Sequence, residues 1–253
     1  LSDLYCKGIK PTSYFLSLAL NKRLAQKKWL KQIKSILNSE QKKFNINLGG
    51  GDTTKSSKLI ITIIVKGFSK IKPVLRHTSK INNDIYVTGN IADSYLGLMV
   101  LKKKSNYGKF NKYFIKKYYE PELQTKFFLH LPKIATASID VSDGVGADLK
   151  HLCQNSNCGA LISLDLLPLS SYCKILIKSK KIQLKNIFSN GDDYQILFTS
   201  NIKNRLKIAS LSKKLGIKIT RIGRIIKGKN ILFKQGDNLI NLKDNKMGHI
   251  HNF

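Results

Sequence analysis

Apolar residues recur along the chain at two different spacings, and the spacings predict different elements. Helical spacing or an amphipathic pattern predicts helices at residues 13–20, 29–37, 93–101, 145–154, 172–179 and 202–215. Short apolar runs, several of them rich in β-branched residues, predict strands at 44–48, 59–68, 85–88, 136–141, 160–164, 194–198 and 217–226. Because helices and strands alternate over most of the chain, we expect an α/β fold with mixed sheets.

The pattern loosens around residues 69–73, and we place a domain boundary there. We therefore predict two domains, at residues 1–70 and 71–253, with no internal repeat or low-complexity linker. The sequence starts with Leu1 and its first methionine is Met99, so we expect it to be the interior of a longer protein with an incomplete N-terminal domain.

The composition is that of a globular protein, because 42% of the 253 residues are hydrophobic. No stretch reaches the roughly 18 to 20 consecutive apolar residues that a membrane span needs, so we expect a soluble protein with no membrane partner. The four cysteines form no CxxC pair and no spacing typical of zinc sites. We expect them to be free thiols in a reducing cytoplasm.

A formal net charge of +30 raises the hypothesis of nucleic-acid binding, since Lys and Arg neutralise phosphates. The lysines are spread over almost every segment, however, and the chain is also rich in Ile and Asn, as an AT-rich genome tends to encode. We attribute the charge mainly to that composition and expect no specific nucleic-acid partner. A non-catalytic basic protein that binds nucleic acid or another partner is the alternative from a different functional class.

Only 15 residues are acidic, against 45 basic ones, so the position of each carboxylate is informative. The segment NLGGGDTTKSS at residues 47–57 places Asp52 beside three glycines. Glycines let consecutive backbone N–H groups bind a phosphate, and a carboxylate there makes sense when Mg²⁺ lies between the two. The alternative is a glycine turn in which Asp52 caps the next segment of the chain. No GK[ST] comes after the glycines, which excludes a Walker A loop.

Two further segments contain clustered aspartates, and each lies next to an apolar run. In SIDVSDGVGADL, Asp140 and Asp143 can converge on one or two cations while Ser142 or a helix N-terminus binds phosphate. In the alternative interpretation, Asp143 is a helix N-cap and Asp140 a turn residue. In SNGDDYQILF, Asp192 and Asp193 adjoin a predicted strand, so only one of them is expected to face a ligand. Together the segments predict a multi-carboxylate site for metal and polyphosphate.

The order of these motifs resembles the thiamine-monophosphate kinase family, within the superfamily of aminoimidazole-ribonucleotide-synthetase-like ATP-binding enzymes. The resemblance runs the full length of the sequence, and the joint occurrence of its motifs is specific. The matching motifs are LSDL at 1–4, GGDTT at 50–54, Arg76 followed by DIYVTG at 84–89, ADSYLGL at 92–98, IDVSDG at 139–144, GDDYQILF at 191–198 and RIGRI at 221–225.

The resemblance implies the two-domain architecture of that superfamily and ATP-dependent phosphorylation of thiamine monophosphate to thiamine diphosphate. It also implies several Mg²⁺ ions, ATP as co-substrate, and a homodimer whose interface uses the N-terminal domain. Carried over by motif, the metal ligands are Asp3, Asp52, Asp140 and Asp143, the ATP contacts are Gly51, Asp52, Arg76 and Ser142, and the substrate contacts are Asp192 and His249. No further catalytic residue is assigned, because the attacking phosphate oxygen is already an anion and needs no strong base.

The sequence departs from the family in two places. Its end, GHIHNF, puts His249 where the family has an aromatic residue that packs on the substrate, and Asn252 interrupts the closing His-Phe pair. The family's GDD and TxD motifs would lie upstream of LSDL, which fits a fragment, and a decayed remnant is the alternative. Within enzymes, the alternative is another ATP-using member of the superfamily, for example one that activates an amide or carbonyl oxygen.

Overall fold

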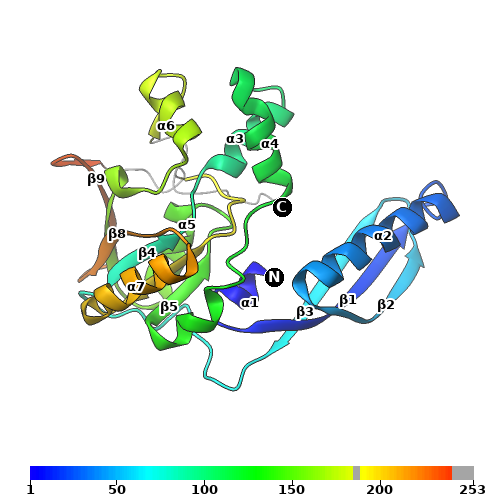
Figure 1. Cartoon of the computed structure of the whole chain (residues 1–253), viewed down its shortest axis with the longest axis horizontal. Coiled ribbons are helices and arrows are strands. Elements are labelled where there is room, and N and C mark those ends of the chain that lie inside the picture. The colour runs from blue at the N-terminus through cyan, green and yellow to red at the C-terminus, as the bar shows by residue number, and fades with distance from the viewer. Residues whose placement is uncertain (185–188, 241–253) are drawn as a thin grey trace. The chain divides into compact units, whose positions relative to one another are not determined.

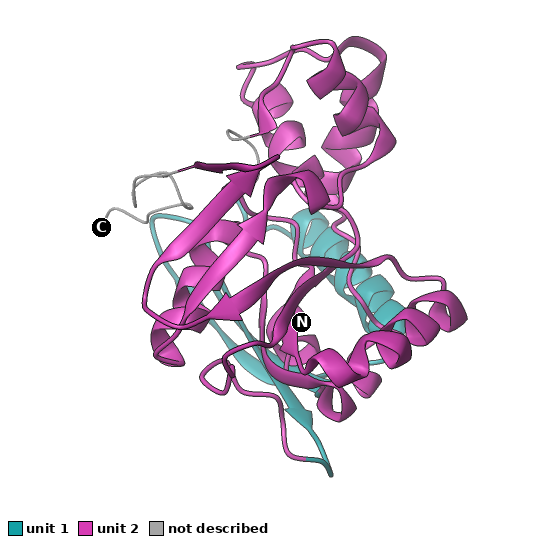
Figure 2. Cartoon of the chain, turned by 90° about the vertical axis from the view of Figure 1, so that its left-hand side faces the viewer, with its two compact units in different colours: residues 1, 9–71 teal, residues 2–8, 72–253 magenta. Residues whose placement is uncertain are grey.

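The computed structural model describes residues 1–184 and 189–240, and its elements form two compact units (Figures 1 and 2). The smaller unit comprises Leu1 and Ile9–Ile71, and the larger one comprises Ser2–Gly8 and the described residues from Lys72 onward. The units are defined by their internal contacts, so a division into domains at residues 70 and 71 stays a prediction.

The smaller unit is a three-stranded sheet with one long helix. Its elements are β1 (Lys10–Leu20), α2 (Lys27–Phe44), β2 (Asn47–Lys55) and β3 (Ile60–Phe68). The central strand β1 runs parallel to β2 and antiparallel to β3. Parallel neighbours need a crossover connection, and α2 provides it, lying along the sheet in Figure 1.

The helix predicted at residues 13–20 is wrong, because this segment belongs to strand β1. Tyr14, Leu18 and Leu20 are buried, a spacing that fits a helix as readily as a strand over so short a run. The segment forms a strand because it hydrogen-bonds to β2 on one side and to β3 on the other, both distant in sequence. The helix predicted at residues 29–37 lies within α2.

The glycine-rich segment also belongs to a strand. The strand predicted at residues 44–48 in fact begins at Asn47 and continues through the glycines to Lys55, because α2 extends to Phe44. Gly51 pairs with Leu16 of β1, and a Cβ on Gly51 would lie 1.9 Å from the Leu16 carbonyl oxygen. Only glycine permits this approach of the two backbones. Asp52 is exposed on the same strand, where its Oδ1 accepts a hydrogen bond from the Thr53 N–H at 2.8 Å.

The larger unit contains a seven-stranded mixed sheet in the order β10-β9-β6-β8-β4-β7-β5. Among the described strand pairs of this sheet, only β6–β9 is parallel. The strands are β4 (Asp84–Thr88), β5 (Ala135–Asp140), β6 (Gly159–Ser163), β7 (Ile196–Ser200), β8 (Ile219–Ile226), β9 (Ile231–Gln235) and β10 (Asn238–Ile240). The predicted mixed α/β class is therefore confirmed.

Both α-helices and short 3₁₀ helices accompany this sheet, and the sequence pattern missed α4 together with β9 and β10. The α-helices are α1 (Ser2–Tyr5), α3 (Asp93–Leu101), α4 (Asn111–Tyr119), α5 (Val145–Asn155), α6 (Ser171–Lys178) and α7 (Arg205–Leu215). The 3₁₀ helices are η1 (Gly108–Phe110), η2 (Phe128–Lys133), η3 (Leu164–Leu166) and η5 (Ile202–Asn204). Within the described residues, none of the helices combines the length and apolar character needed to cross a membrane.

The main core lies on one face of the seven-stranded sheet. Ile85 and Val87 of β4 point into it and pack with the buried side of α5. Strand residues alternate between faces, so Asp84 and Tyr86 point to the opposite, outer face. There the Tyr86 ring stacks on Phe198 with centroids 5.2 Å apart. Both rings are buried, and Phe198 also contacts the buried Phe127, so apolar side chains cover this face of the sheet at β4 and β7 as well.

Candidate functional site

A pocket of about 460 Å³ in the larger unit collects several of the predicted site residues. It lies where α1, the segment before β4, the end of β5 and the start of α5 come together. Asp3, Cys6, Lys7, Leu75, Arg76, His77, Ile139, Asp140, Ser142, Asp143, Asp148 and His151 line it. The structure therefore places the predicted metal ligands Asp3, Asp140 and Asp143 in one pocket with the predicted ATP contacts Arg76 and Ser142.

Hydrogen bonds from the N-terminal segment hold Asp3 beside Asp140. The Ser2 hydroxyl donates to Oδ2 of the buried Asp140 at 2.7 Å. The Lys7 ammonium donates to the Ser138 carbonyl oxygen at 2.7 Å, and the Ser138 hydroxyl donates to the Cys6 carbonyl oxygen. These contacts fasten residues 2–8 to β5. They explain why residues of the LSDL and IDVSDG motifs, far apart in sequence, line one pocket.

The pocket brings several carboxyl groups together, and two of them are buried. Burial raises the pKa of Asp140, and the nearby charge of Asp3 raises it too, against the lowering effect of the Ser2 hydrogen bond. Burial raises the pKa of Asp148 to about 8, with a further contribution from the charge of Asp143. Bringing carboxylates together in this way costs free energy that a bound cation would offset.

Asp148 is the residue that sequence reasoning left outside the site. Its Oδ2 accepts hydrogen bonds from the N–H groups of Asp143 and Gly144, both at 3.1 Å. The N-cap position of α5 is Gly144, so the alternative in which Asp143 caps this helix is wrong. The available signal was a third carboxylate one turn inside the helix. Lys7, His77 and His151 gave no comparable signal.

The start of the GDDYQILF motif, residues 191–194, packs directly on the loop after β5. The Asp192 N–H donates to the Ser142 carbonyl oxygen at 2.9 Å, and the Tyr194 N–H donates to the Val141 carbonyl oxygen at 2.8 Å. A Cβ on Gly191 would lie 1.8 Å from the Ser142 carbonyl oxygen. Asp192 and Tyr194 have positive φ angles, 66° and 51°, and β7 begins only at Ile196. The strand predicted to start at residue 194 therefore starts later.

Asp193 has a structural role that distinguishes it from Asp192. Its Oδ2 accepts a hydrogen bond from the Ala92 N–H at 2.6 Å, and its Oδ1 accepts one from the Ser94 N–H at 3.3 Å. It thereby caps the N-terminus of α3. Burial raises the pKa of Asp193 to about 8. Asp192, whose backbone is bonded to the pocket residue Ser142, is only half-buried. Its role as a substrate contact stays a prediction.

Three predicted site residues lie elsewhere. Gly51 and Asp52 are exposed on β2 of the smaller unit, and their roles toward metal and ATP stay predictions. His249 lies outside the described residues.

The donor chemistry of the pocket suits Mg²⁺. Within residues 1–184 and 189–240, no three His, Cys, Asp or Glu side chains are close enough together to hold a metal by themselves. Mg²⁺ does not require such a set, because it is usually bound by one or two carboxylates together with waters and substrate phosphates. Asp3, Asp140 and Asp143 supply hard oxygen donors. Arg76 lines the same pocket and can bind an anion.

Comparisons with known proteins show which family the chain is similar to. Residues 1–69 match the family model described as AIR synthase related protein, N-terminal domain. A thiamine-monophosphate kinase of Buchnera aphidicola (subsp. Schizaphis graminum) is 39% identical over 243 residues, which cover 93% of this chain and 73% of the relative. One of Haemophilus influenzae is 35% identical over 228 residues, covering 89% and 68%. The solved structure of AaThiL complexed with AMPPCP and TMP has a TM-score of 0.80 at 27% identity, covering 94% of this chain and 75% of that chain.

The mixed sheets and the N-terminal family match define a protein of the AIR synthase-like fold. Within that class, the identity over most of both chains decides the family. The chain belongs to the thiamine-monophosphate kinases, a family of ATP-using enzymes, and the resemblance inferred from its motifs is confirmed.

Proposed function

We propose that this protein transfers the γ-phosphoryl group of ATP to thiamine monophosphate, giving thiamine diphosphate, with Mg²⁺ bound in the pocket around Asp140. Family membership carries the proposal, and the AaThiL structure with AMPPCP and TMP supports both substrates. The pocket supports it as well, because it combines carboxylates that suit Mg²⁺ with an exposed arginine that suits phosphate.

The side chains of the pocket suit positioning more than proton transfer. Arg76 is exposed at its edge, and its planar guanidinium can hold phosphate oxygens with two hydrogen bonds. Asp3, Asp140 and Asp143 would hold Mg²⁺, and Ser142 would lie beside ATP. Asp52 is proposed as a metal ligand and Gly51 as an ATP contact, both on β2 of the smaller unit. When bound, Mg²⁺ supplies positive charge that reduces repulsion between the two polyanions. Asp192 and His249 would contact the thiamine substrate.

No general base is needed in this scheme. The terminal phosphate of thiamine monophosphate is already ionised near neutral pH, so its oxygen can attack in line once it is positioned. The residues then contribute by orienting the phosphates and excluding water, and the Ser2–Asp140 hydrogen bond orients a carboxylate for that purpose.

The direct test is product analysis with thiamine monophosphate, ATP and Mg²⁺, using the full protein. We expect thiamine diphosphate from the wild type and a loss of at least about 100-fold in kcat for Asp143→Asn. Asp237→Asn, an exposed aspartate in the turn before β10, is the matched control and should keep wild-type turnover. ATP consumption without thiamine diphosphate would point to another ATP-using activity of the superfamily and overturn the proposal.

We also propose that the protein is a homodimer that joins through the smaller unit. Strand β3 is at an edge of its sheet, and Ile60, Ile61, Ile63 and Ile64 are 45–63% exposed on it. A long apolar edge strand is an aggregation hazard unless another chain covers it. The molar mass in solution should be that of a dimer, and Ile61→Lys combined with Ile63→Lys should yield a monomer. A monomeric wild type would contradict this.

A cytoplasmic location is the remaining part of the proposal. The four cysteines are buried free thiols, which fits a reducing compartment. Cell fractionation tests it, and recovery of the protein outside the cytoplasmic fraction would refute it.

A further inference from the structure

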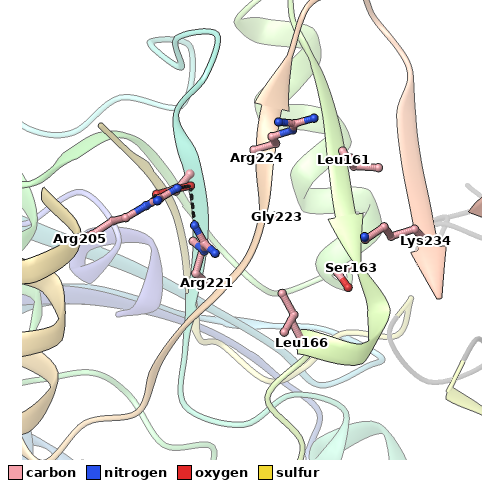
Figure 3. Close-up of a pocket in the computed structure, with 9 residues that line it drawn as sticks. Leu161, Ser163, Leu166, Arg205, Arg221, Gly223, Arg224 and Lys234 are labelled. Atoms are coloured by element: carbon pink, nitrogen blue, oxygen red, sulfur yellow. Dashed lines mark hydrogen bonds and ion pairs between the residues drawn. The ribbon is translucent and has the colours of Figure 1, made fainter. Parts of the chain in front are cut away.

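A second pocket, of about 330 Å³, lies on the outer face of the seven-stranded sheet (Figure 3). We call it the outer-sheet pocket. It shares no lining residue with the pocket around Asp140. Its described lining residues are Asp84, Leu161, Ser163, Leu166, Arg205, Arg221, Gly223, Arg224 and Lys234. Four of them are cationic and one is acidic, which leaves an excess of three positive charges.

An irregularity in β8 creates this concentration of charge. Residues three apart in a regular strand point to opposite faces, yet Arg221 and Arg224 are both exposed while Ile222 and Ile225 are both buried. The pairing with β4 shifts between Ile85 and Tyr86, as it does at a β-bulge, so Arg221 stands opposite Tyr86 and Arg224 opposite Asp84. Bulges often re-aim side chains at functional positions. Here the bulge brings two guanidinium groups to one face.

Asp84 holds two of the arginines in place. Its carboxylate accepts hydrogen bonds from Nε and Nη2 of Arg205 at 2.6 and 2.8 Å, and from Nη1 of Arg221 at 3.5 Å. Burial alone would raise the pKa of Asp84, but the hydrogen bonds and positive charge of Arg205, with the charge of Arg221, lower it below its ordinary value. A guanidinium has five N–H donors, so these bonds leave most donors of both arginines available to a ligand.

The remaining cations face the same space without a carboxylate of their own. Figure 3 shows Lys234 extending from β9 toward Ser163 and Arg224 lying beyond Gly223 on β8. In the described part of the chain, neither Arg224 nor Lys234 has a side-chain hydrogen bond or ion pair. Leu161 and Leu166 add an apolar wall, and the Ser163 hydroxyl adds a neutral donor. Guanidinium groups bind phosphate with two parallel hydrogen bonds, and an ammonium adds a point charge.

We propose that the outer-sheet pocket binds a compact diphosphate group, either as free pyrophosphate or carried by a small organic molecule. The excess of three charges suits a ligand with two or three negative charges. The volume, at the lower end of the range for small-molecule pockets, suits a ligand of that size. This site is independent of the proposed phosphoryl transfer, because none of its residues belongs to the pocket around Asp140.

A nucleic-acid backbone fits these observations less well. Phosphates along a strand need a cationic stripe, whereas the four cations converge on one concave space. Asp84 also lines that space, and its carboxylate would repel a continuous chain of phosphates. A compact diphosphate can bind beside Asp84, whose ion pairs orient Arg205 and Arg221.

Calorimetric titration of the full protein with pyrophosphate, in EDTA and at low salt, tests the proposal. EDTA removes Mg²⁺, so polyphosphate cannot bind through a metal in the pocket around Asp140. The site variant combines Arg224→Ala with Lys234→Ala, and the ion pairs of Asp84 with Arg205 and Arg221 involve neither side chain. The control variant combines Lys227→Ala with Lys229→Ala, which removes the same charge from the exposed segment between β8 and β9. Urea unfolding of all three proteins checks that the fold is intact.

We expect one pyrophosphate per chain, binding about tenfold or more weaker to the site variant, and near wild-type binding to the control variant. A parallel titration with ADP distinguishes the two sources of the diphosphate. Equal affinity for both ligands indicates recognition of the diphosphate alone, and tighter ADP binding that is lost in the site variant indicates an organic diphosphate.

Absence of pyrophosphate and ADP binding to the wild type would overturn the proposal, as would equal weakening in the site and control variants. A titration with a short DNA duplex covers the remaining case. Duplex binding that is lost in the site variant, with no pyrophosphate binding, would replace the proposal with a nucleic-acid surface.

Discussion

Replacing Gly191 by alanine tests whether the GDDYQILF motif positions the loop after β5. A Cβ at this position would lie 1.8 Å from the Ser142 carbonyl oxygen, 2.4 Å from its carbon and 2.8 Å from the Asp143 carbonyl carbon. All three atoms are backbone, so no side chain can rotate away. Gly191 does not have the positive φ that would itself penalise alanine. The steric contact is therefore the dominant effect of this substitution.

The size of the effect can be worked out from these distances. Real Cβ atoms essentially never come within 3.0 Å of such atoms, so the two segments must separate by more than 1 Å. That movement would stretch the 2.9 Å hydrogen bond from Asp192 to Ser142. Overpacking of this kind costs about 1 to 3 kcal/mol of stability. Displacing catalytic groups by about 1 Å costs on the order of 100-fold in rate, so kcat/KM should fall by about that factor.

The assay measures kcat/KM for thiamine diphosphate formation together with the free energy of unfolding in urea. Gly216→Ala is the matched control, because it meets no atom within 4 Å but has a φ of +64°, at the C-terminal end of α7. It should lose about 1 to 2 kcal/mol of stability with normal activity at temperatures where it is folded. Wild-type kcat/KM in Gly191→Ala, or equal activity losses in both variants, would refute the positioning argument.

Three further variants test the electrostatics and the core. Asp193 has a raised pKa, so its contribution to stability is complete below the ordinary carboxyl pKa and is lost as the pH rises through about 8. Between pH 5 and 8, the free energy of unfolding in urea should fall with rising pH in the wild type, relative to Asp193→Asn, by up to about 1 kcal/mol per pH unit. The same pH dependence of unfolding free energy in both proteins would contradict this. Asp84 has a lowered pKa, so its contribution is present above the ordinary carboxyl pKa and is lost as the pH falls through the lower folded value. Asp84→Asn should cost about 1 to 2 kcal/mol at pH 7 and less in acid, and an equal cost at both would count against the ion pairs with Arg205 and Arg221. Phe114→Ala removes a fully buried ring that contacts Tyr107 and Tyr113, and thermal or urea unfolding should show a loss of about 3 to 5 kcal/mol; a loss below about 1 kcal/mol would mean that this part of the core is loosely packed.

Elements governed by local sequence could be predicted with little error. The helix expected at residues 93–101 matches α3, and the strand expected at 85–88 lies within β4. Both are short segments rich in apolar residues. Residues 13–20 and the glycines of 49–51 were misassigned, because their conformation depends on hydrogen bonds to strands distant in sequence. The spacing of apolar residues within a segment does not show which distant strands it will pair with.

The sequence alone determined the family and the residue types of the site. Short motifs in a fixed order specify them, and in a chain with only 15 acidic residues each carboxylate stands out. Tertiary structure alone decided which of these residues meet and what each contacts. It joins Ser2 to Asp140, assigns Asp193 to the cap of α3 and Asp148 to the pocket, and aligns Arg221 with Arg224 through a bulge. These relations depend on backbone geometry and burial, which arise only when distant segments pack together.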